Sequence, residues 1–558
     1  MNEYLKLHEA DCRNCYKCIR HCEVKAISFN SNRAKIVHDE CVLCGQCFIV
    51  CPQNAKVIRD DLPVVKEMIS GDAPVYASIA PSFAANYPGV SADALRAALI
   101  KLGFADAGET AVGATIVKNY YDEMLDTEAQ PILISSCCHT VNMLIRRYYP
   151  AALPYLAKIQ SPMQAHCALL KRENPGAKTV FIGPCISKKE EGDRYPGIVD
   201  CVLTFAELSK WLAEEGITLD AGSAESPGGK ARLFPIVGGI IRSMRADNKN
   251  YRYLVVDGID QCIAALKDIS KGGTDRCFIE MSACKGSCVG GPGMDHVNTT
   301  PVKSYIAVDK IAGSDDFLVD MPEAGLLEKD IFAKSINASK PGSKALEEAL
   351  RKMGKDKPSD ELNCGSCGYE TCREKAAAII SGKADLSMCL PYLMEKAQSF
   401  SDTIINNTPD GVIVLNEAME IQQINSAACS ILNVRNQDDV LGMNVVCVLD
   451  PSLFAEVIAS RHNVYERKIC LAEYTRHVVM TVIYDKSYNI VICVMRDVTE
   501  TEEEREYKKD RDRKTVEITD KVIEKQMRTV QEIASLLGET TAETKIALTK
   551  LKETLHNE

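Results

Sequence analysis

The spacing of the first eight cysteines constrains this chain more than any other feature of its sequence. Two runs repeat one pattern, in which three cysteines are separated by two residues each and a fourth follows after three more. Three cysteines at this spacing wrap one 4Fe–4S cube, and the fourth cysteine of each run ligates the cube of the other run. The predicted ligand sets are Cys12, Cys15, Cys18 and Cys51 for one cluster, and Cys41, Cys44, Cys47 and Cys22 for the second. Zinc is the alternative, but zinc sites favour two separated pairs of ligands over three close cysteines.

The total of 25 cysteines in 558 residues also indicates metal binding rather than disulfides. Disulfide scaffolds are usually small and secreted, and the first residues of this chain lack the pattern of a signal peptide. We therefore expect a cytoplasmic protein of three or four domains. A net charge of −11 argues against a nucleic-acid or membrane surface. No apolar run approaches the roughly 18 to 20 residues that a membrane span needs.

Residues 1–60 resemble a bacterial two-cluster 4Fe–4S ferredoxin domain. Both cysteine runs match that family, and so does Pro52 after the second run. Glu23 stands where the family usually has proline, a departure that touches no predicted ligand. The resemblance implies two clusters close together, which carry electrons rather than perform catalysis.

Between residues 73 and 325, apolar runs alternate with amphipathic stretches, which is typical of α/β folds. The β-rich runs are Ala77–Ile79, Ile132–Ile134, Thr179–Ile182 and Phe278–Met281. Three cysteine-bearing segments occur in this region. One cysteine from each of the first two, together with Cys284 and Cys288, would bring four thiolates from strand ends, enough for another cube. Gly286, Gly290 and Gly291 suggest that the backbone approaches a bulky inorganic group closely.

The three segments resemble the signature loops of the FeFe-hydrogenases, whose domain would cover residues 73–325. They are Ile134-Ser-Ser-Cys-Cys-His139, Gly183-Pro-Cys-Ile-Ser-Lys-Lys-Glu-Glu191 and Glu280-Met-Ser-Ala-Cys-Lys-Gly-Ser-Cys-Val-Gly-Gly291. The resemblance implies a two-lobed α/β domain that holds an H-cluster, a 4Fe–4S cube joined to a two-iron unit with CO, cyanide and azadithiolate. The implied ligands of the cube are Cys138, Cys185, Cys284 and Cys288, and Cys288 would also bridge to the two-iron unit.

The same resemblance implies roles for residues that are not ligands. Cys137 matches the cysteine that passes protons, and Lys188 matches the lysine that hydrogen-bonds a cyanide, as a compact ammonium donor can. Other segments match the walls of the family's pocket. These wall residues are Ala80, Pro81, Ser82, Ser161, Pro162, Pro184 and Phe234, with Gly238 and Gly239.

The chain departs from the catalytic family members at three places. His139-Thr140 replaces proline and tryptophan, and Ser282 replaces a methionine near the two-iron unit. The segment from 113 to 121 carries tyrosines where those enzymes have the glutamates of their proton path. Because proton transfer needs groups of suitable pKa within hydrogen-bond reach, we expect slower or rerouted proton delivery. His139 or Glu191 are candidate substitutes, although a histidine beside a cluster loop is more often a packing residue.

A further cysteine block follows a predicted linker at 335–344. Residues 346–396 resemble a small helical 4Fe–4S domain, and the implied ligands are Cys364, Cys367, Cys372 and Cys389. The three close cysteines again favour a cube over zinc.

Residues 397–500 resemble a PAS domain, from the strand pattern near Thr408–Leu415 to Val494–Thr499. The spacings of Cys429, Cys447, Cys470 and Cys493 form no ligand motif, so we expect all four to pack in the core. The tail, 501–558, is predicted to be a dimerising or partner-binding helix, with a solvated charged helix as the alternative. Its apolar stripe, which Gly538 interrupts, contains Ile523, Met527, Val530, Ala534 and Leu537.

Together these patterns predict a multidomain α/β and α+β protein with the order ferredoxin-like domain, H-cluster domain, small helical 4Fe–4S domain, PAS domain and C-terminal helix. The favoured interpretation is a sensory FeFe-hydrogenase of low turnover in an anaerobic cell, with three 4Fe–4S clusters besides the H-cluster. Expected partners are H2 and protons, ferredoxin or another redox carrier, hydrogenase maturation proteins, a signalling kinase or phosphatase, and a second copy in a homodimer. The alternatives are a ferredoxin-linked bioenergetic hydrogenase and a non-catalytic iron–sulfur assembly or relay protein.

Overall fold

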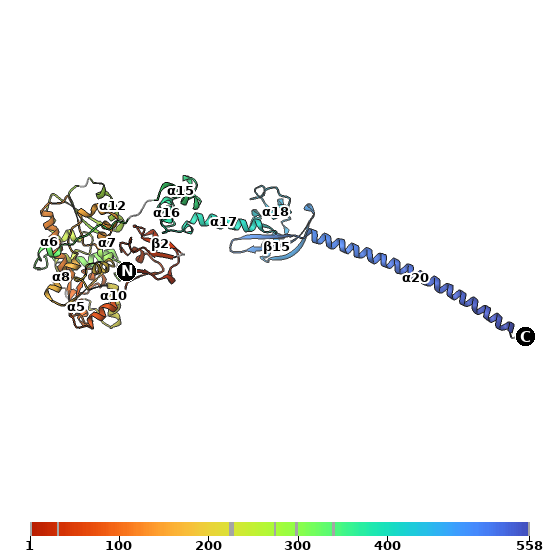
Figure 1. Ribbon diagram of the computed structural model, residues 1–558, viewed down its shortest axis with the longest axis horizontal. Helices are drawn as coiled ribbons and strands as arrows, with labels where there is room; N and C mark the ends of the chain where they lie inside the picture. The colour runs from red at the N-terminus through yellow and green to blue at the C-terminus, as the bar shows by residue number, and fades with distance from the viewer. Residues whose placement is uncertain are drawn as a thin grey trace. The chain divides into compact units, whose positions relative to one another are not determined.

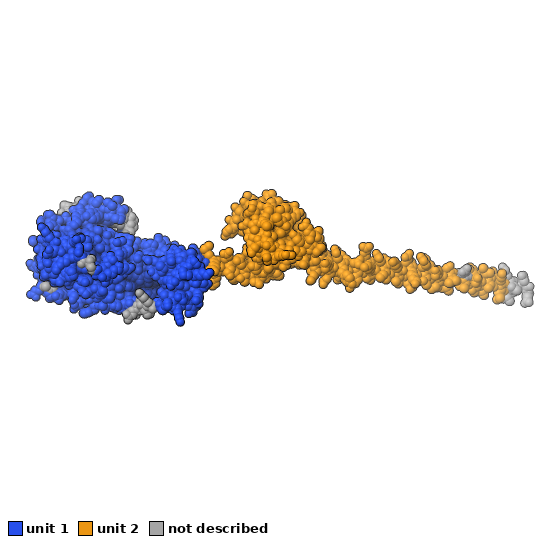
Figure 2. Space-filling model, turned by 90° about the horizontal axis from the view of Figure 1, so that it is seen from above, with its two compact units in different colours: residues 1–393 blue, residues 394–558 orange. Residues whose placement is uncertain are grey.

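The computed structural model describes residues 3–30, 33–221, 228–272, 275–295, 300–336 and 341–555 (Figure 1). The chain forms two compact units, Met1–Leu393 and Met394–Glu558, which Figure 2 colours separately. Among the described residues, no helix is long and apolar enough to cross a membrane. The predicted linker at 335–344 lies partly outside the described residues.

The N-terminal domain repeats one fold for each cysteine run. Its strands pair antiparallel, the first with the last and the two middle ones with each other: β1 (Leu5–Leu7) with β4 (Lys56–Ile58), and β2 (Ile27–Asn30) with β3 (Arg33–Ile36). Short helices α1 (Lys17–Arg20) and α2 (Gln46–Ile49) follow the loops. Left-handed residues occupy equivalent places in the two halves, as the pairs Asn14 and Leu43, Tyr16 and Gly45, and Lys25 and Asn54. The two runs therefore curl in the same way.

The central domain has two lobes, each built on a parallel sheet. The first sheet has the order β6-β5-β8-β9 and the second the order β10-β11-β7. Their strands are β5 (Val75–Ile79), β6 (Asp106–Glu109), β7 (Ile132–Ile134), β8 (Lys178–Gly183), β9 (Cys201–Thr204), β10 (Arg252–Asp257) and β11 (Cys277–Ser282). Continuous apolar runs in β7, β8 and β11 are buried, as parallel sheets require, whereas Leu254 and Val255 of the edge strand β10 are exposed. All three predicted cysteine segments lie just past the carboxyl ends of strands, where open α/β sheets bind ligands.

Helices cover both sheets and connect the strands. The longer ones are α3 (Leu62–Ile69), α5 (Ala92–Lys101), α6 (Thr110–Asp126), α7 (His139–Tyr148), α8 (Pro162–Glu173), α9 (Ser187–Arg194), α10 (Phe205–Glu214), α12 (Ile259–Lys271) and α13 (Pro301–Ile311). One hydrophobic core fills the first lobe, and another runs from the second lobe into the N-terminal domain and the small cysteine domain. The three domains of the first unit thus share buried surface.

The small cysteine domain contains α15 (Ser343–Lys352) and α16 (Cys372–Ile380) and docks on the N-terminal domain. The Phe29 amide donates to the carbonyl of Lys383 at 2.7 Å, and Lys25 Nζ donates to the carbonyl of Gly368 at 2.8 Å. Lys383 Nζ pairs with Glu40 at 2.5 Å. Helix α17 (Leu390–Asn407) begins directly after Cys389 and continues into the second unit.

The second unit contains an antiparallel sheet with the order β13-β12-β16-β15-β14. Its elements are β12 (Gly411–Asn416), β13 (Ile421–Ile424), α18 (Ser426–Ile431), α19 (Ser452–Ser460), β14 (Val464–Leu471), β15 (Arg476–Asp485) and β16 (Ile490–Asp497). Alternate residues of the central strands face a core with α18 and α19. The mixed multidomain fold class predicted from the sequence is confirmed.

The prediction that four cysteines of this unit pack in its core is wrong for two of them. Cys429 and Cys493 are buried, but Cys447 and Cys470 are exposed. Cys447 is the last residue of a short 3-10 helix, Val445–Cys447, in which Val445 packs in the core and Cys447 does not. Cys470 lies on β14, an edge strand that is mostly exposed.

The tail forms one helix, α20 (Thr499–Leu555), which runs through Gly538 without a break. The predicted interruption at Gly538 therefore affects the apolar stripe and not the helix. Ile523, Met527, Val530 and Leu537 of the stripe are exposed along this helix.

Candidate metal centre

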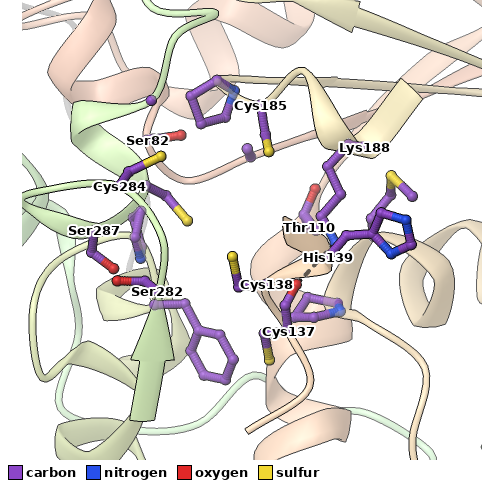
Figure 3. A pocket seen from close by; sticks show the side chains of 18 of the residues that line it. Ser82, Thr110, Cys137, Cys138, His139, Cys185, Lys188, Ser282, Cys284 and Ser287 are labelled. Carbon is purple, nitrogen blue, oxygen red and sulfur yellow. Dashed lines mark hydrogen bonds between the residues drawn. The ribbon is translucent and has the colours of Figure 1, made fainter. Parts of the chain in front are cut away.

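The loops after β5, β7, β8 and β11 enclose a cavity of about 110 Å³ between the two lobes. Cys138, Cys185, Cys284 and Cys288 all line it, although they come from three distant parts of the sequence. In Figure 3 the labelled side chains of Cys138, Cys185 and Cys284 point into the same space. The structure therefore brings together the four cysteines that the sequence predicts as ligands of a cube.

The chemistry of these thiols fits a metal cluster. Burial, reinforced by neighbouring cysteines, raises the pKa of Cys138 and Cys288 and raises that of Cys284 well above its usual value. Several thiolates would repel one another in this enclosed space, so without metal Cys138, Cys284 and Cys288 stay protonated. Metal binding displaces such protons and supplies the missing positive charge.

The glycines of the third loop allow a close approach of the backbone, and Gly291 lines the cavity. A Cβ atom at Gly290 would lie 2.1 Å from the carbonyl oxygen of Lys285, and one at Gly291 would lie 2.5 Å from that of Pro184. Gly286 adopts a left-handed φ of +81° and its amide donates to Asp257 at 2.8 Å. These glycines permit the loop to pack on itself and on the neighbouring loop after β8.

Most of the predicted wall residues line the cavity. They are Ala80, Pro81, Ser82, Pro162, Pro184, Phe234 and Ser282. Ser161, Gly238 and Gly239 do not line it, and the Ser161 hydroxyl caps α8 by accepting the amide of Gln164 at 3.5 Å. Its position next to Pro162 is therefore explained by the start of the helix.

Lys188 reaches the cavity from the first turn of α9. Its ammonium donates to the carbonyl of Cys137 at 3.0 Å and to Glu191 at 2.5 Å. Burial alone would lower the pKa of Lys188, but the neighbouring Glu191 carboxylate outweighs it and the pKa is raised. Lys188 is therefore a charged donor at the wall of the cavity.

Cys137 lines the cavity and contacts Tyr121, one of the tyrosines that replace the expected glutamates. The Tyr121 hydroxyl lies 3.2 Å from Cys137 Sγ and accepts the amide of Ser136 at 2.9 Å. Burial raises the pKa of Cys137 to about 12 and raises that of Tyr121 well above its usual value. A buried phenol thus occupies the place beside the thiol.

His139 also lines the cavity and is completely buried. Its Nε2 contacts Glu190, which also pairs with Arg194, and its Nδ1 lies 3.8 Å from Glu191. Burial lowers the pKa of His139 well below its usual value, so the ring is neutral. The contacts fit a packed and hydrogen-bonded side chain, and a relay role for His139 remains a prediction.

Glu280 is a wall residue that the sequence analysis did not single out. Its carboxylate accepts the amides of Gly238 at 2.9 Å and Ile241 at 3.0 Å. Burial nevertheless raises the pKa of Glu280 to about 7. The signal in the sequence that could have pointed to Glu280 is its position as the single acidic residue in the otherwise uncharged strand Cys277–Ser282.

Three smaller cavities gather the remaining predicted ligands. Cys12, Cys15, Cys18 and Cys51 line one, Cys22, Cys41, Cys44 and Cys47 line a second, and Cys364, Cys367, Cys372 and Cys389 line a third. Among the described residues, no group of three His, Cys, Asp or Glu side chains is placed to hold a metal ion. The fourth cysteine of each N-terminal run does lie with the other run, as the crossed ligation requires.

The second of these cavities lies next to the central one. Gly45, between Cys44 and Cys47, packs so closely that a Cβ there would lie 2.5 Å from the ring of Pro292 and 3.2 Å from Ile186. Cys44 is also near enough to contribute to the raised pKa of Cys284. The two cysteine-lined cavities therefore lie close to each other.

Family models match most of the chain. Residues 73–292 match the C-terminal domain of the iron-only hydrogenase large subunit, and residues 11–55 match a 4Fe–4S dicluster domain. Residues 360–391 match an Fe–S cluster domain, and residues 399–498 match the PAS fold. The chain therefore contains iron–sulfur cluster domains and a PAS domain.

Curated relatives fall into two groups. The NADP-reducing hydrogenase subunit HndD of Solidesulfovibrio fructosivorans is 26% identical over 49% of this chain and 58% of its own length. Iron hydrogenase 1 of Clostridium pasteurianum is 25% identical over 33% of this chain and 41% of its own length. The cytosolic Fe–S cluster assembly factor NAR1 of Encephalitozoon cuniculi is 27% identical over 38% of this chain and 66% of its own length.

The chain thus spans less than two thirds of the length of each of these relatives. Among solved structures, an [FeFe]-hydrogenase HydA1 variant from Chlamydomonas reinhardtii aligns with a TM-score of 0.39 and 16% identity. That alignment covers 50% of this chain and 100% of the other.

Proposed function

We propose that this chain, whose central domain belongs to the iron-only hydrogenase family, responds to hydrogen by the reversible reaction H2 = 2 H⁺ + 2 e⁻ at its central cavity. The two electrons would leave through the iron–sulfur domains. The redox state would be conveyed through the PAS domain and α20 to a signalling partner. Substrate, cofactor composition and partner are all parts of this proposal.

The observation that carries the proposal is the combination of four ligand cysteines with Cys137 and Lys188 around one cavity. An H-cluster bound there would supply a two-iron unit that binds and splits H2. Neither Cys137 nor Lys188 is needed to hold a cube, so their presence at the wall favours a second, ligand-bearing metal unit. Lys188 would donate a hydrogen bond to an anionic ligand, and Cys137 would hold the proton nearest the reacting atoms.

The surroundings of Cys137 favour slow proton transfer. Low turnover of this kind suits a sensor better than a bioenergetic enzyme. The Cys137 neighbour Tyr121 is buried and has a raised pKa, so it exchanges protons less readily at neutral pH than a glutamate would. The second unit supplies a PAS domain and a long exposed helix, which suit a signalling output. Low turnover with a clear spectroscopic response is therefore the expected behaviour.

The test is to load the anaerobically purified chain with a synthetic two-iron precursor and record infrared spectra under argon and under hydrogen. Protein-bound CO and cyanide bands that change under hydrogen are the expected result. Full iron content in the cubes without any protein-bound bands would contradict the proposal. High turnover with ferredoxin would instead support a bioenergetic hydrogenase.

A second candidate function is iron–sulfur cluster assembly. The similarity to the NAR1 assembly factor and to the mouse cytosolic iron-sulfur assembly component 3, at 23% identity over 47% of this chain, favours it. That function would use the cysteines as cluster ligands and leave Lys188 without a partner in the cavity. Transfer of labelled iron–sulfur clusters to an acceptor protein, with no retained CO bands, would identify it.

A further inference from the structure

Lys329 is a buried lysine that lies outside the part of the chain matched to the hydrogenase domain. Its backbone is fixed near the cavity by the strand-like contact of Glu328 with Ile159 and by the Gln160 amide, which donates to the carbonyl of Leu327 at 2.9 Å. The side chain of Lys329 is 2% exposed. A lysine is rarely buried so completely without a specific charge partner.

That partner is the carboxylate that also holds Lys188. One oxygen of Glu191 accepts a hydrogen bond from Lys329, and the other accepts one from Lys188 at 2.5 Å. Lys329 also donates to the side-chain oxygen of Gln164 at 2.9 Å, and its ammonium lies 4.5 Å from the ring centre of Tyr195. Both carboxylate oxygens of Glu191 thus accept a hydrogen bond from a lysine, which restrains rotation of the side chain.

The position of the Glu191 carboxylate determines the direction in which the Lys188 ammonium points. An ammonium has three N–H donors, and Lys188 gives one to Glu191 and one to the carbonyl of Cys137. Among the described residues no third acceptor for Lys188 is present, so the third donor remains for the cavity that Lys188 lines. If Glu191 moved, this third donor would turn away.

Lys329 also adds a positive charge that the local carboxylates do not balance. The buried ammonium groups of Lys188 and Lys329 share the single carboxylate of Glu191, and the neighbouring Glu190 pairs with Arg194. Burying an extra cation is costly unless something negative lies nearby. An anionic group bound in the cavity would supply that negative charge.

We propose that Lys329 is a positioning residue for the central cavity: it holds Glu191 so that Lys188 keeps one N–H directed at an anionic ligand there. This inference rests on the proposed function for the identity of that ligand, a cyanide of the two-iron unit. The placement of Lys188 by Lys329 can be tested without the two-iron unit.

The experiment compares the full-length Lys329→Met variant with the full-length wild-type protein. The methionine keeps an aliphatic side chain and removes the charge. Lys334→Met is the matched control, because Lys334 follows closely in the chain, is 58% exposed and pairs only at the surface with Asp39. In protein loaded with the two-iron precursor, Lys329→Met is expected to shift the cyanide bands and to lower H2 turnover about tenfold. Lys334→Met is expected to change neither.

A crystal structure of Lys329→Met without the two-iron unit provides the second measurement. Glu191 is expected to rotate toward His139 Nδ1, and Lys188 to lose its hydrogen bond to Cys137. If Lys329→Met fails to retain its clusters, Lys329→Leu replaces it, since a shorter apolar side chain also removes the ammonium that holds Glu191.

The outcomes separate the two proposals. Wild-type protein that acquires no CO and cyanide bands after treatment with the two-iron precursor contradicts the proposed function, while the crystal structure still tests the placement of Lys188. Unmoved Glu191 and Lys188 in the variant, or unchanged cyanide bands in a loaded protein, would overturn the role of Lys329.

Discussion

At the scale of single residues, the cavity depends on buried polar groups whose partners come from distant segments. Tyr121 is the first example, because its hydroxyl accepts the Ser136 amide and contacts Cys137. Tyr121→Phe would leave that buried amide without an acceptor, which costs about 1–3 kcal/mol. We expect a corresponding decrease in the free energy of unfolding of the first unit, measured by denaturant titration of the anaerobic protein. An unchanged free energy would mean that water replaces the phenol.

Glu280 gives a prediction about pH. Its pKa of about 7 in the folded protein lies above the value of 4.5 for a free glutamate, so the folded state binds the extra proton between these pH values. The contribution of Glu280 is therefore fully present below about pH 4.5 and is lost as pH rises through 7, by about 3 kcal/mol in total. The variant Glu280→Gln cannot titrate.

The stability of Glu280→Gln relative to wild type should thus increase from pH 5 to pH 8. Melting temperatures of the two proteins at several pH values measure this difference, and the titrations of other groups cancel between them. Parallel melting curves across the range would contradict the raised pKa.

The two N-terminal cysteine sets followed from sequence spacing, because short loops fix neighbouring thiols, whereas the central set followed from the resemblance of three loops to a known family. Lys329, Glu280 and the contact of Tyr121 with Cys137 did not follow. Lys329 and Glu191 are separated by 138 residues in the chain, and no local pattern connects them. Only the packed fold shows that they meet.

At the scale of elements, the strands were predictable and their partners were not. The apolar runs at Ile132–Ile134 and Phe278–Met281 became β7 and β11, because buried parallel strands read as continuous apolar segments. Their parallel pairing across the sheet depends on long-range topology. The exposed Cys470 shows the same limit, since a residue pattern does not reveal which strand lies at the edge.

Asn425 connects two elements of the second unit. Its side chain accepts the amides of Val412 and Ala428, both at 2.8 Å, and donates to the carbonyls of Ile405 and Asp410, both at 2.9 Å. It thus ties the end of α17 to β12 and α18. Asn425→Ala would leave these buried groups unsatisfied, at a cost of about 3 kcal/mol or more.

We expect Asn425→Ala to lower the melting temperature of the PAS domain while that of the first unit stays unchanged. Calorimetry of the full chain resolves the two transitions. Asn407→Ala is the control, because Asn407 is exposed and bonds only within α17. Equal melting temperatures for the two variants would contradict the role of Asn425.

At the scale of the whole molecule, the small cysteine domain depends on a close contact with the N-terminal domain. A Cβ at Gly368 would lie 2.8 Å from Ile19, and Gly368 also adopts a left-handed φ of +94°. Gly368→Ala should therefore loosen the docking and speed exchange of the Phe29 amide about tenfold, measured by hydrogen–deuterium exchange. Gly365→Ala is the control, because it carries similar backbone strain, at a φ of +69°, with nothing closer than 3.9 Å. Equal exchange in both variants would contradict the docking.

The crossed arrangement of the N-terminal cysteines has a consequence for biosynthesis. Cys51 completes the cavity of the first run and Cys22 that of the second, so neither site is whole until both runs have left the ribosome. The central cavity needs Cys288 and, for its charge, Lys329, so it is complete only about 280 residues later in translation. The cavity of the small cysteine domain is the last to be completed, because it also needs Cys389. The order of the domains along the chain is therefore also the earliest order in which a cell can fill them with iron.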